Sequence, residues 1–74
     1  MKKICYIEIL QNDVYIEYNN GDIQYLSFTK AKQMIYASHQ EQFKYICVDH
    51  EKSNTFLNNL LARYKIVHGM LVFR

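Results

Sequence analysis

Residues 3–28 decide the fold, and they read KICYIEIL (3–10), QND (11–13), VYIEY (14–18), NNGD (19–22) and IQYLSF (23–28). The three longer segments are rich in β-branched and aromatic residues, which favour strands, and short polar breaks separate them. Breaks of three and four residues are short enough to join antiparallel neighbours. The stretch therefore predicts a three-stranded antiparallel meander.

The second break has Asn20-Gly21 at its centre. Both residues tolerate the positive φ angles of a two-residue type I′ hairpin loop. With that loop, Tyr18 lies opposite Ile23, Ile16 opposite Tyr25 and Glu17 opposite Gln24.

The first break closes with a loop of two, three or four residues. Side chains alternate between faces, so an odd loop would place Ile7 opposite Glu17 and mix apolar with charged residues. An even loop places Ile9 opposite Ile16 and Ile7 opposite Tyr18, which keeps apolar residues together, and we adopt it. The predicted core face then contains Cys5, Ile7, Ile9, Val14, Ile16, Tyr18, Ile23 and Tyr25.

The opposite face of the meander has two unusual features. Leu10, Tyr15 and Leu26 form an apolar row across the three strands, and Glu8 lies directly opposite Glu17, where like charges are destabilising. Either the second helix covers the row, or a binding partner does and supplies a cation near the glutamates. The full face contains Tyr6, Glu8, Leu10, Tyr15, Glu17, Gln24 and Leu26, with Phe28 at its end.

The second half of the chain predicts two helices and two strands. Thr29 is expected to cap a helix over 30–40, and the apolar segment 43–48 is expected to be a central strand covered on both faces. Ser53 is expected to cap a helix over 54–64, whose apolar stripe is Leu57, Leu60, Leu61 and Tyr64. That helix ends either near Tyr64, before a strand over 66–73 with a bulge at Gly69, or near His68 with Gly69 as its C-cap residue.

The resulting order is β-β-β-α-β-α-β. It predicts one α+β domain over residues 1–74, an antiparallel sheet with a three-stranded N-terminal meander and two helices. A chain of 74 residues is marginally stable alone, which makes a homodimer or a larger partner an expectation.

We expect a cytoplasmic protein without a membrane span, because Glu8 interrupts the apolar N-terminal stretch after five residues. Half of the residues are hydrophobic and 22% are charged, which is typical of a folded domain, and no apolar run reaches the roughly 18 residues of a span. Cys5 and Cys47 lie in apolar strands and are expected to be buried thiols, although one disulfide between them stays open. The abundance of Ile, Asn, Lys, Tyr and Phe is typical of AT-rich bacteria, phages and plasmids.

The motifs of catalysis and of cofactor binding are absent. The three histidines and two cysteines lack the spacing of a metal site, and two isolated glycines make no phosphate loop. Cys47 and His50 are three apart, which in a strand places them on opposite faces. We therefore predict a protein that is not an enzyme and that binds neither metal nor cofactor.

Two binding functions stay open. A protein-binding module, an adaptor or an inhibitor of its partner, is favoured by aromatic and aliphatic side chains within an acidic rim. Its expected contact residues are Tyr6, Glu8, Leu10, Tyr15, Glu17 and Leu26. A small nucleic-acid-binding protein is the alternative, because exposed tyrosines and lysines can hold single strands. Its expected contact residues are Lys30, Lys32, Gln33 and Arg63.

Overall fold

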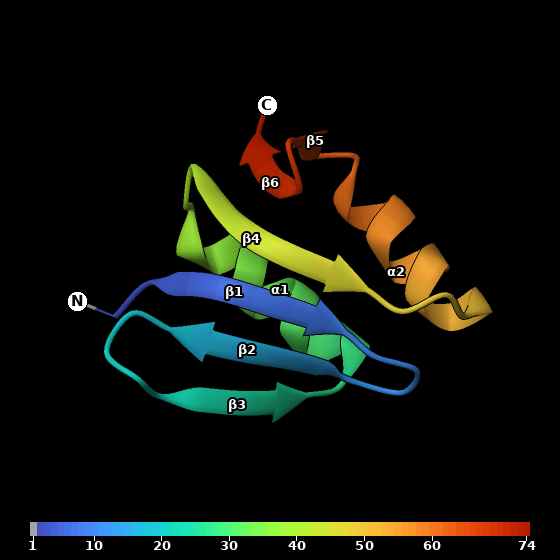
Figure 1. Cartoon of the computed structure of the whole chain (residues 1–74), viewed down its shortest axis with the longest axis horizontal. Helices are drawn as coiled ribbons and strands as arrows, with labels where there is room; N and C mark the ends of the chain where they lie inside the picture. Colours follow the sequence, from blue (N-terminus) through green and yellow to red (C-terminus); the bar gives the residue numbers. More distant parts are fainter. Residues whose placement is uncertain (1) are drawn as a thin grey trace.

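The computed structural model describes residues 2–74 as a six-stranded sheet packed against two helices (Figure 1). This confirms the α+β class. In chain order the elements are β1 Ile4–Ile9, β2 Val14–Tyr18, β3 Ile23–Leu26, α1 Phe28–Ser38, β4 Gln42–Cys47, α2 Glu51–Leu60, β5 Tyr64–Val67 and β6 Met70–Phe73. The strand order across the sheet is β3-β2-β1-β4-β6-β5.

The sheet is mixed rather than purely antiparallel. The β1–β4 pair at its centre is parallel, and the other four strand pairs of the described residues are antiparallel. The parallel pair follows from the connection, because α1 carries the chain from the edge strand β3 across β2 and β1. A helical crossover of this kind joins strands that run in the same direction.

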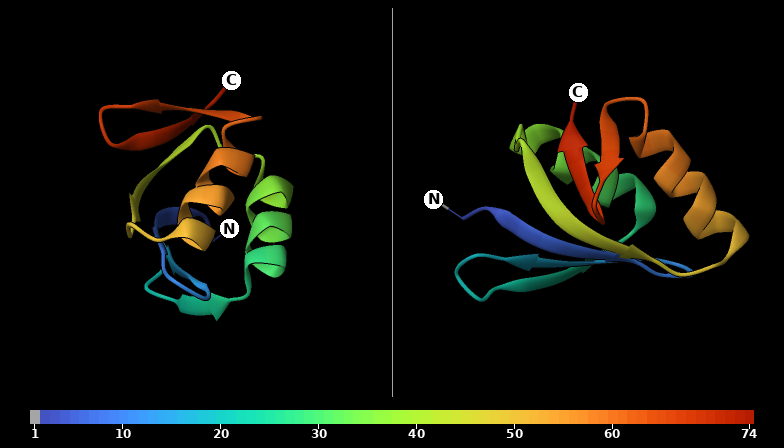
Figure 2. Two further views of the ribbon diagram at one scale, coloured as in Figure 1. Left: turned by 90° about the vertical axis from the view of Figure 1, so that its right-hand side faces the viewer. Right: turned by 45° about the horizontal axis from the view of Figure 1, so that its top comes forward.

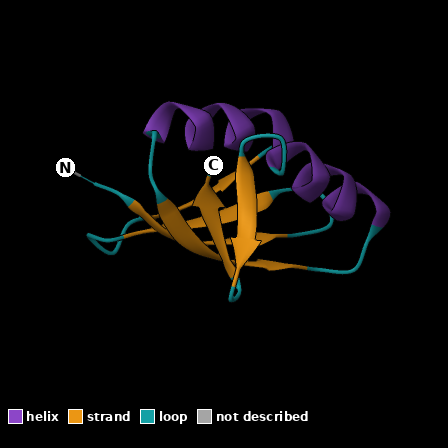
Figure 3. Ribbon diagram, turned by 90° about the horizontal axis from the view of Figure 1, so that it is seen from above, coloured by secondary structure: helices purple, strands orange, loops and turns teal. Residues whose placement is uncertain are grey.

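Both helices cover the same face of the sheet (Figures 2 and 3). The connections β3-α1-β4 and β4-α2-β5 each join parallel strands, and both step across the sheet in the same direction. Crossovers are almost always right-handed, so two steps in one direction place both helices on one side. The other face of the sheet is left without a helix, and we call it the bare face.

The β1–β2 loop is even, as predicted, but the strand register is shifted by two residues. Ile9 lies opposite Val14 and Ile7 opposite Ile16, which leaves a four-residue loop closed by a hydrogen bond from the Leu10 N–H to the Asp13 carbonyl. A shift of two residues preserves the faces, so the inward side chains are those expected. The predicted pairing of Glu8 with Glu17 is wrong, because Glu8 lies opposite Tyr15.

Cys5 is exposed rather than buried. The register slips between Ile4 and Tyr6, so Cys5 is the extra residue of a β-bulge. Ile4 takes the buried place instead. Cys47 is half-buried, and both thiols are free.

The β2–β3 register differs from the prediction by one residue. Tyr15 lies opposite Tyr25 and Glu17 opposite Ile23, because the loop has three residues, with Gly21 at φ +92°. A one-residue shift exchanges the two faces of a strand. Ile23 and Tyr25 therefore lie on the bare face, whereas Leu26 packs against the core, as does Phe28 at the start of α1.

Both helices begin earlier than predicted. The Ser27 hydroxyl, rather than that of Thr29, accepts from the Lys30 N–H and caps α1. His50, rather than Ser53, caps α2 by accepting from the Lys52 N–H.

The C-terminal segment forms a hairpin of two strands rather than one strand. The α2 helix ends at Leu60, and Val67 then pairs with Met70 across the two-residue loop His68-Gly69. Both loop residues have positive φ, 50° and 76°, as a type I′ turn requires. Neither predicted end of the second helix is correct.

One hydrophobic core lies between the sheet and the helices. Strand residues predicted to face inward supply five of its members, which are Ile7, Ile9, Val14, Ile16 and Tyr18. Ile4 of β1 also belongs to it, and the helices and the later strands complete it with Ala31, Ile35, Phe43, Phe56, Leu60, Tyr64 and Leu71.

Candidate functional site

The bare face presents side chains from all six strands. Alternation along each strand and the strand registers place these side chains on it. They are Ile23 and Tyr25 of β3, Tyr15 and Glu17 of β2, Tyr6 and Glu8 of β1, Gln42, Lys44 and Ile46 of β4, Met70 and Val72 of β6, and Lys65 and Val67 of β5.

Four of the six residues predicted to bind a partner lie together on this face: Tyr6, Glu8, Tyr15 and Glu17. The other two do not. Leu10 belongs to the β1–β2 loop, and Leu26 lies on the helix-covered side of the edge strand. The second helix does not cover Tyr15, because both helices pack on the opposite face (Figure 3).

A row of three tyrosines takes the place of the predicted Leu10–Tyr15–Leu26 row. The ring centroids of Tyr6 and Tyr15 are 6.2 Å apart, and those of Tyr15 and Tyr25 are 5.3 Å apart. Both contacts are edge-to-face, a geometry that aromatic quadrupoles favour. We call Tyr6, Tyr15 and Tyr25 the tyrosine row, and it crosses three strands.

Two glutamates are tied to the row. The Tyr6 hydroxyl donates to Glu8 (2.7 Å), and the Tyr15 hydroxyl donates to Glu17 (2.8 Å). Burial and the Glu8 hydrogen bond raise the pKa of Tyr6 to about 12, and the Glu17 hydrogen bond and burial raise the pKa of Tyr15 to about 12. Each carboxylate thus holds its tyrosine protonated and keeps acceptor capacity for a further donor.

The sequence prediction missed the other half of the bare face. Ile46 is 54% exposed there, although the segment 43–48 was expected to be covered on both sides. Tyr25 is 61% exposed and Ile23 is 54% exposed. The alternation of Lys44 with Phe43 and Tyr45 was the available signal, because it marks one face of β4 as less apolar than the other.

Charge divides the bare face into two halves. Glu8 and Glu17 lie on β1 and β2, whereas Lys44 and Lys65 lie on β4 and β5. Within residues 2–74 the structure contains one ion pair, between Lys2 and Asp22. No ion pair within residues 2–74 therefore joins the acidic residues of the face to its lysines, although Lys44 lies directly opposite Tyr6 on the neighbouring strand.

The residues predicted for nucleic-acid binding fall into two groups on the helical side. Lys32 and Arg63 both lie over the Tyr36 ring, with Arg63 Cζ 4.0 Å from its centroid. Lys30 and Gln33 instead line a shallow hollow with Leu26 and Met34. The four residues do not form one basic groove.

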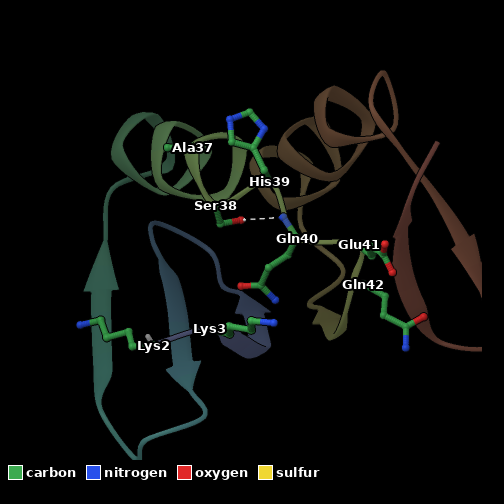
Figure 4. Close-up of a pocket in the computed structure, with 8 residues that line it drawn as sticks. All are labelled: Lys2, Lys3, Ala37, Ser38, His39, Gln40, Glu41 and Gln42. Carbon is green, nitrogen blue, oxygen red and sulfur yellow. Dashed lines mark hydrogen bonds between the residues drawn. The ribbon is translucent and has the colours of Figure 1, made fainter.

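A cleft of about 630 Å³ lies where α1 ends (Figure 4). The Gln40 side chain occupies its floor, accepting from the Ile4 N–H and donating to the Ile4 carbonyl, so it replaces a neighbouring strand at the start of β1. Lys2 and Lys3 bring positive charge to the cleft and Glu41 brings negative charge. The carbonyl end of the α1 dipole disfavours an anion there, and we assign no ligand to the cleft.

The histidine, cysteine and acidic side chains of residues 2–74 are dispersed over the molecule. No three His, Cys, Asp or Glu side chains of this range cluster as metal ligands would. Burial, with help from Asp49, raises the pKa of the Cys47 thiol, which disfavours the reactive thiolate. No helix of the described residues is long and apolar enough to cross a bilayer.

Comparison with known proteins adds no relative: no family model, no curated protein and no solved structure matches this chain. The bare face is therefore the feature from which a function has to be argued.

Proposed function

We propose that this chain is a non-catalytic protein-binding module that acts in the cytoplasm, as an adaptor for or an inhibitor of its partner. Its contact surface is the bare face of the sheet, centred on the tyrosine row. The single observation behind the proposal is a six-stranded sheet with both helices on one side and exposed aromatic and aliphatic side chains on the other. The free state of both cysteines fits the reducing cytoplasm.

The composition of the face supports a protein partner. Tyrosines are enriched at the energetic centres of interfaces, because each combines a large apolar ring with a hydroxyl. Tyr25 and Ile46 are more than half exposed, so both have large apolar surface to bury.

The glutamates define the chemistry of that partner. Glu8 and Glu17 each accept one tyrosine hydroxyl and have no ion-pair partner within residues 2–74. A fitting partner presents lysine or arginine among apolar side chains, since a buried carboxylate needs a cation or further donors.

Nucleic-acid binding is the second candidate, because stacked bases can use tyrosines on an open sheet face. Two observations count against it. The tyrosine rings contact one another edge-to-face, and Glu8 and Glu17 lie beside them, where they would repel phosphates.

A capture experiment with matched variants tests the proposal. The wild-type chain and the Tyr15→Ala and Lys52→Glu variants are immobilised and exposed to a nuclease-treated lysate of the native host. Lys52 is exposed on α2, away from the bare face, and serves as the control. We expect a protein retained by wild type and Lys52→Glu, and bound about 30-fold more weakly by Tyr15→Ala, which corresponds to about 2 kcal/mol.

Salt separates the two candidates. Protein binding centred on apolar contacts should change little with added salt. Nucleic-acid affinity should fall steeply, because the release of counterions from the phosphates is less favourable at higher salt concentration. A gel shift with random single strands that depends on Tyr15, together with no captured protein, would replace the first candidate with the second.

A further inference from the structure

The second half of the bare face has the chemistry that the first half requires. Glu8 and Glu17 require a partner that presents a cationic side chain surrounded by apolar side chains. Lys44 and Lys65 lie in such a setting, beside Ile46, Met70, Val72 and Val67 on the same face. Acidic and basic halves on one surface make that surface complementary to itself when one copy is turned by half a revolution.

We infer that the bare face binds a second copy of this chain, stacked face to face, with a two-fold axis that runs along the strands between β1 and β4. The inference rests on the proposed function, because it names the protein that the bare face binds. The product is a sandwich of two six-stranded sheets with all four helices outside.

The strand order sets which strands meet. The axis passes through the middle of the order β3-β2-β1-β4-β6-β5, so β1 lies over β4 of the second copy. In the same way β2 lies over β6 and β3 over β5. The acidic half of each copy then covers the basic half of the other, so the dimer contains two equivalent acidic–basic contacts.

The strand registers place particular residues together. Ile23, Glu17, Tyr6, Lys44, Met70 and Val67 share one level across the sheet. Rotation about the axis brings Lys44 of the second copy over Tyr6. Glu17 flanks Tyr6 on the neighbouring strand and Glu8 follows two residues along, so the incoming ammonium meets both carboxylates. At the edge, Ile23 meets Val67 of the second copy.

Charge repulsion disfavours a dimer whose two-fold axis runs perpendicular to the strands. A two-fold axis across the strands would stack β1 on β1 and β2 on β2, so that Glu8 and Glu17 of both copies would meet. Like charges at a buried interface cost several kcal/mol, and the axis along the strands avoids that contact.

The area of the face predicts a weak, reversible dimer. Strands about 4.8 Å apart and residues about 3.3 Å apart along each strand give the face on the order of 500 Å² per copy. The total of about 1,000 Å² is at the lower limit for a specific interface, so the dissociation constant is expected near the micromolar range.

Charge reversal and mixing test this arrangement. Sedimentation equilibrium of the full chain up to ~100 μM should show a wild-type dimer, and Lys44→Glu or Glu17→Lys alone should weaken it at least about tenfold. An equal mixture of the two variants should restore a dimer, because each reversed charge then meets its opposite. Glu8→Lys replaces Glu17→Lys in the mixture if the latter fails to fold, as judged by circular dichroism, and Lys52→Glu should leave the dimer unchanged.

Three results would overturn the inference. They are a wild-type chain that stays monomeric up to ~100 μM, a dimer that the reversed charges do not weaken, and variants that each dimerise less well but fail to rescue one another. A monomer whose bare face still captures a different protein in a Tyr15-dependent way would refute the inference and leave the proposed function standing. Loss of both self-association and Tyr15-dependent capture would refute both.

Discussion

Tyr15 shows how a single hydrogen bond makes stability depend on pH. Its hydroxyl donates to Glu17, and this bond, together with burial, raises the pKa of Tyr15 from 10.0 to about 12. A raised pKa in the folded state stabilises the protein fully below the unfolded value, and that stabilisation is lost as pH rises through the folded value. We expect the midpoint of urea unfolding to fall between pH 10 and 12, and to fall less in Tyr15→Phe. Equal falls in the two proteins would contradict the role of this phenol.

Ser53 is a second residue whose role the structure redefines. It is fully buried on α2, and its hydroxyl donates to the Leu10 carbonyl at 2.6 Å, so it joins the helix to the β1–β2 loop. Removal of the donor leaves a shielded carbonyl unpaired, which typically costs about 1–3 kcal/mol. We expect Ser53→Ala to lower the free energy of unfolding, measured in urea, by that amount. Asn58→Ala, at an exposed position of the same helix, is the control and should change it by less than about 0.5 kcal/mol.

At the scale of the element, the start of α1 separates the structure from the sequence prediction. Two hydroxyl residues, Ser27 just before the helix and Thr29 in its first turn, both have the chemistry of a cap. Because the Ser27 hydroxyl accepts from the Lys30 N–H, we expect Ser27→Ala to cost about 1 kcal/mol of unfolding free energy. Thr29→Ala should cost less than about 0.5 kcal/mol. The reverse order, measured by chemical denaturation, would restore Thr29 as the cap.

The strands show which features a sequence can specify. Their existence and the inward faces of β1 and β2 were predictable, because only one parity keeps Ile7, Ile9 and Ile16 together. The exact register was not, since a slip of two residues leaves the same side chains inward. The parity of β3 was also ambiguous, because Ile23 and Tyr25 on one side compete with Leu26 on the other.

At the scale of the whole molecule, the bare face is a consequence of topology. The crossovers through α1 and α2 step in one direction, so their common handedness leaves one side of the sheet without a helix. The sequence identified four residues of the candidate site through alternation within two strands. It missed Lys44 and Ile46, because their neighbours on the face belong to other strands, β1 and β6. The β1–β4 pairing joins segments about 38 residues apart, and no local pattern in the sequence predicts a pairing over that distance.

The inferred dimer makes thermal stability depend on concentration. A second copy that binds only the folded chain stabilises it by RT ln(1 + [L]/Kd), so a change from tenfold below to tenfold above Kd contributes about 1.4 kcal/mol. For a domain of this length that free energy raises Tm by roughly 5–10 °C. We expect this rise by calorimetry in wild type and in Lys52→Glu. Lys44→Glu should melt at nearly the same temperature at both concentrations, because it loses the contact with Tyr6 and the two glutamates of the second copy. A wild-type Tm that is independent of concentration would mean that folding and self-association are not linked, and that water rather than a second sheet covers the tyrosine row.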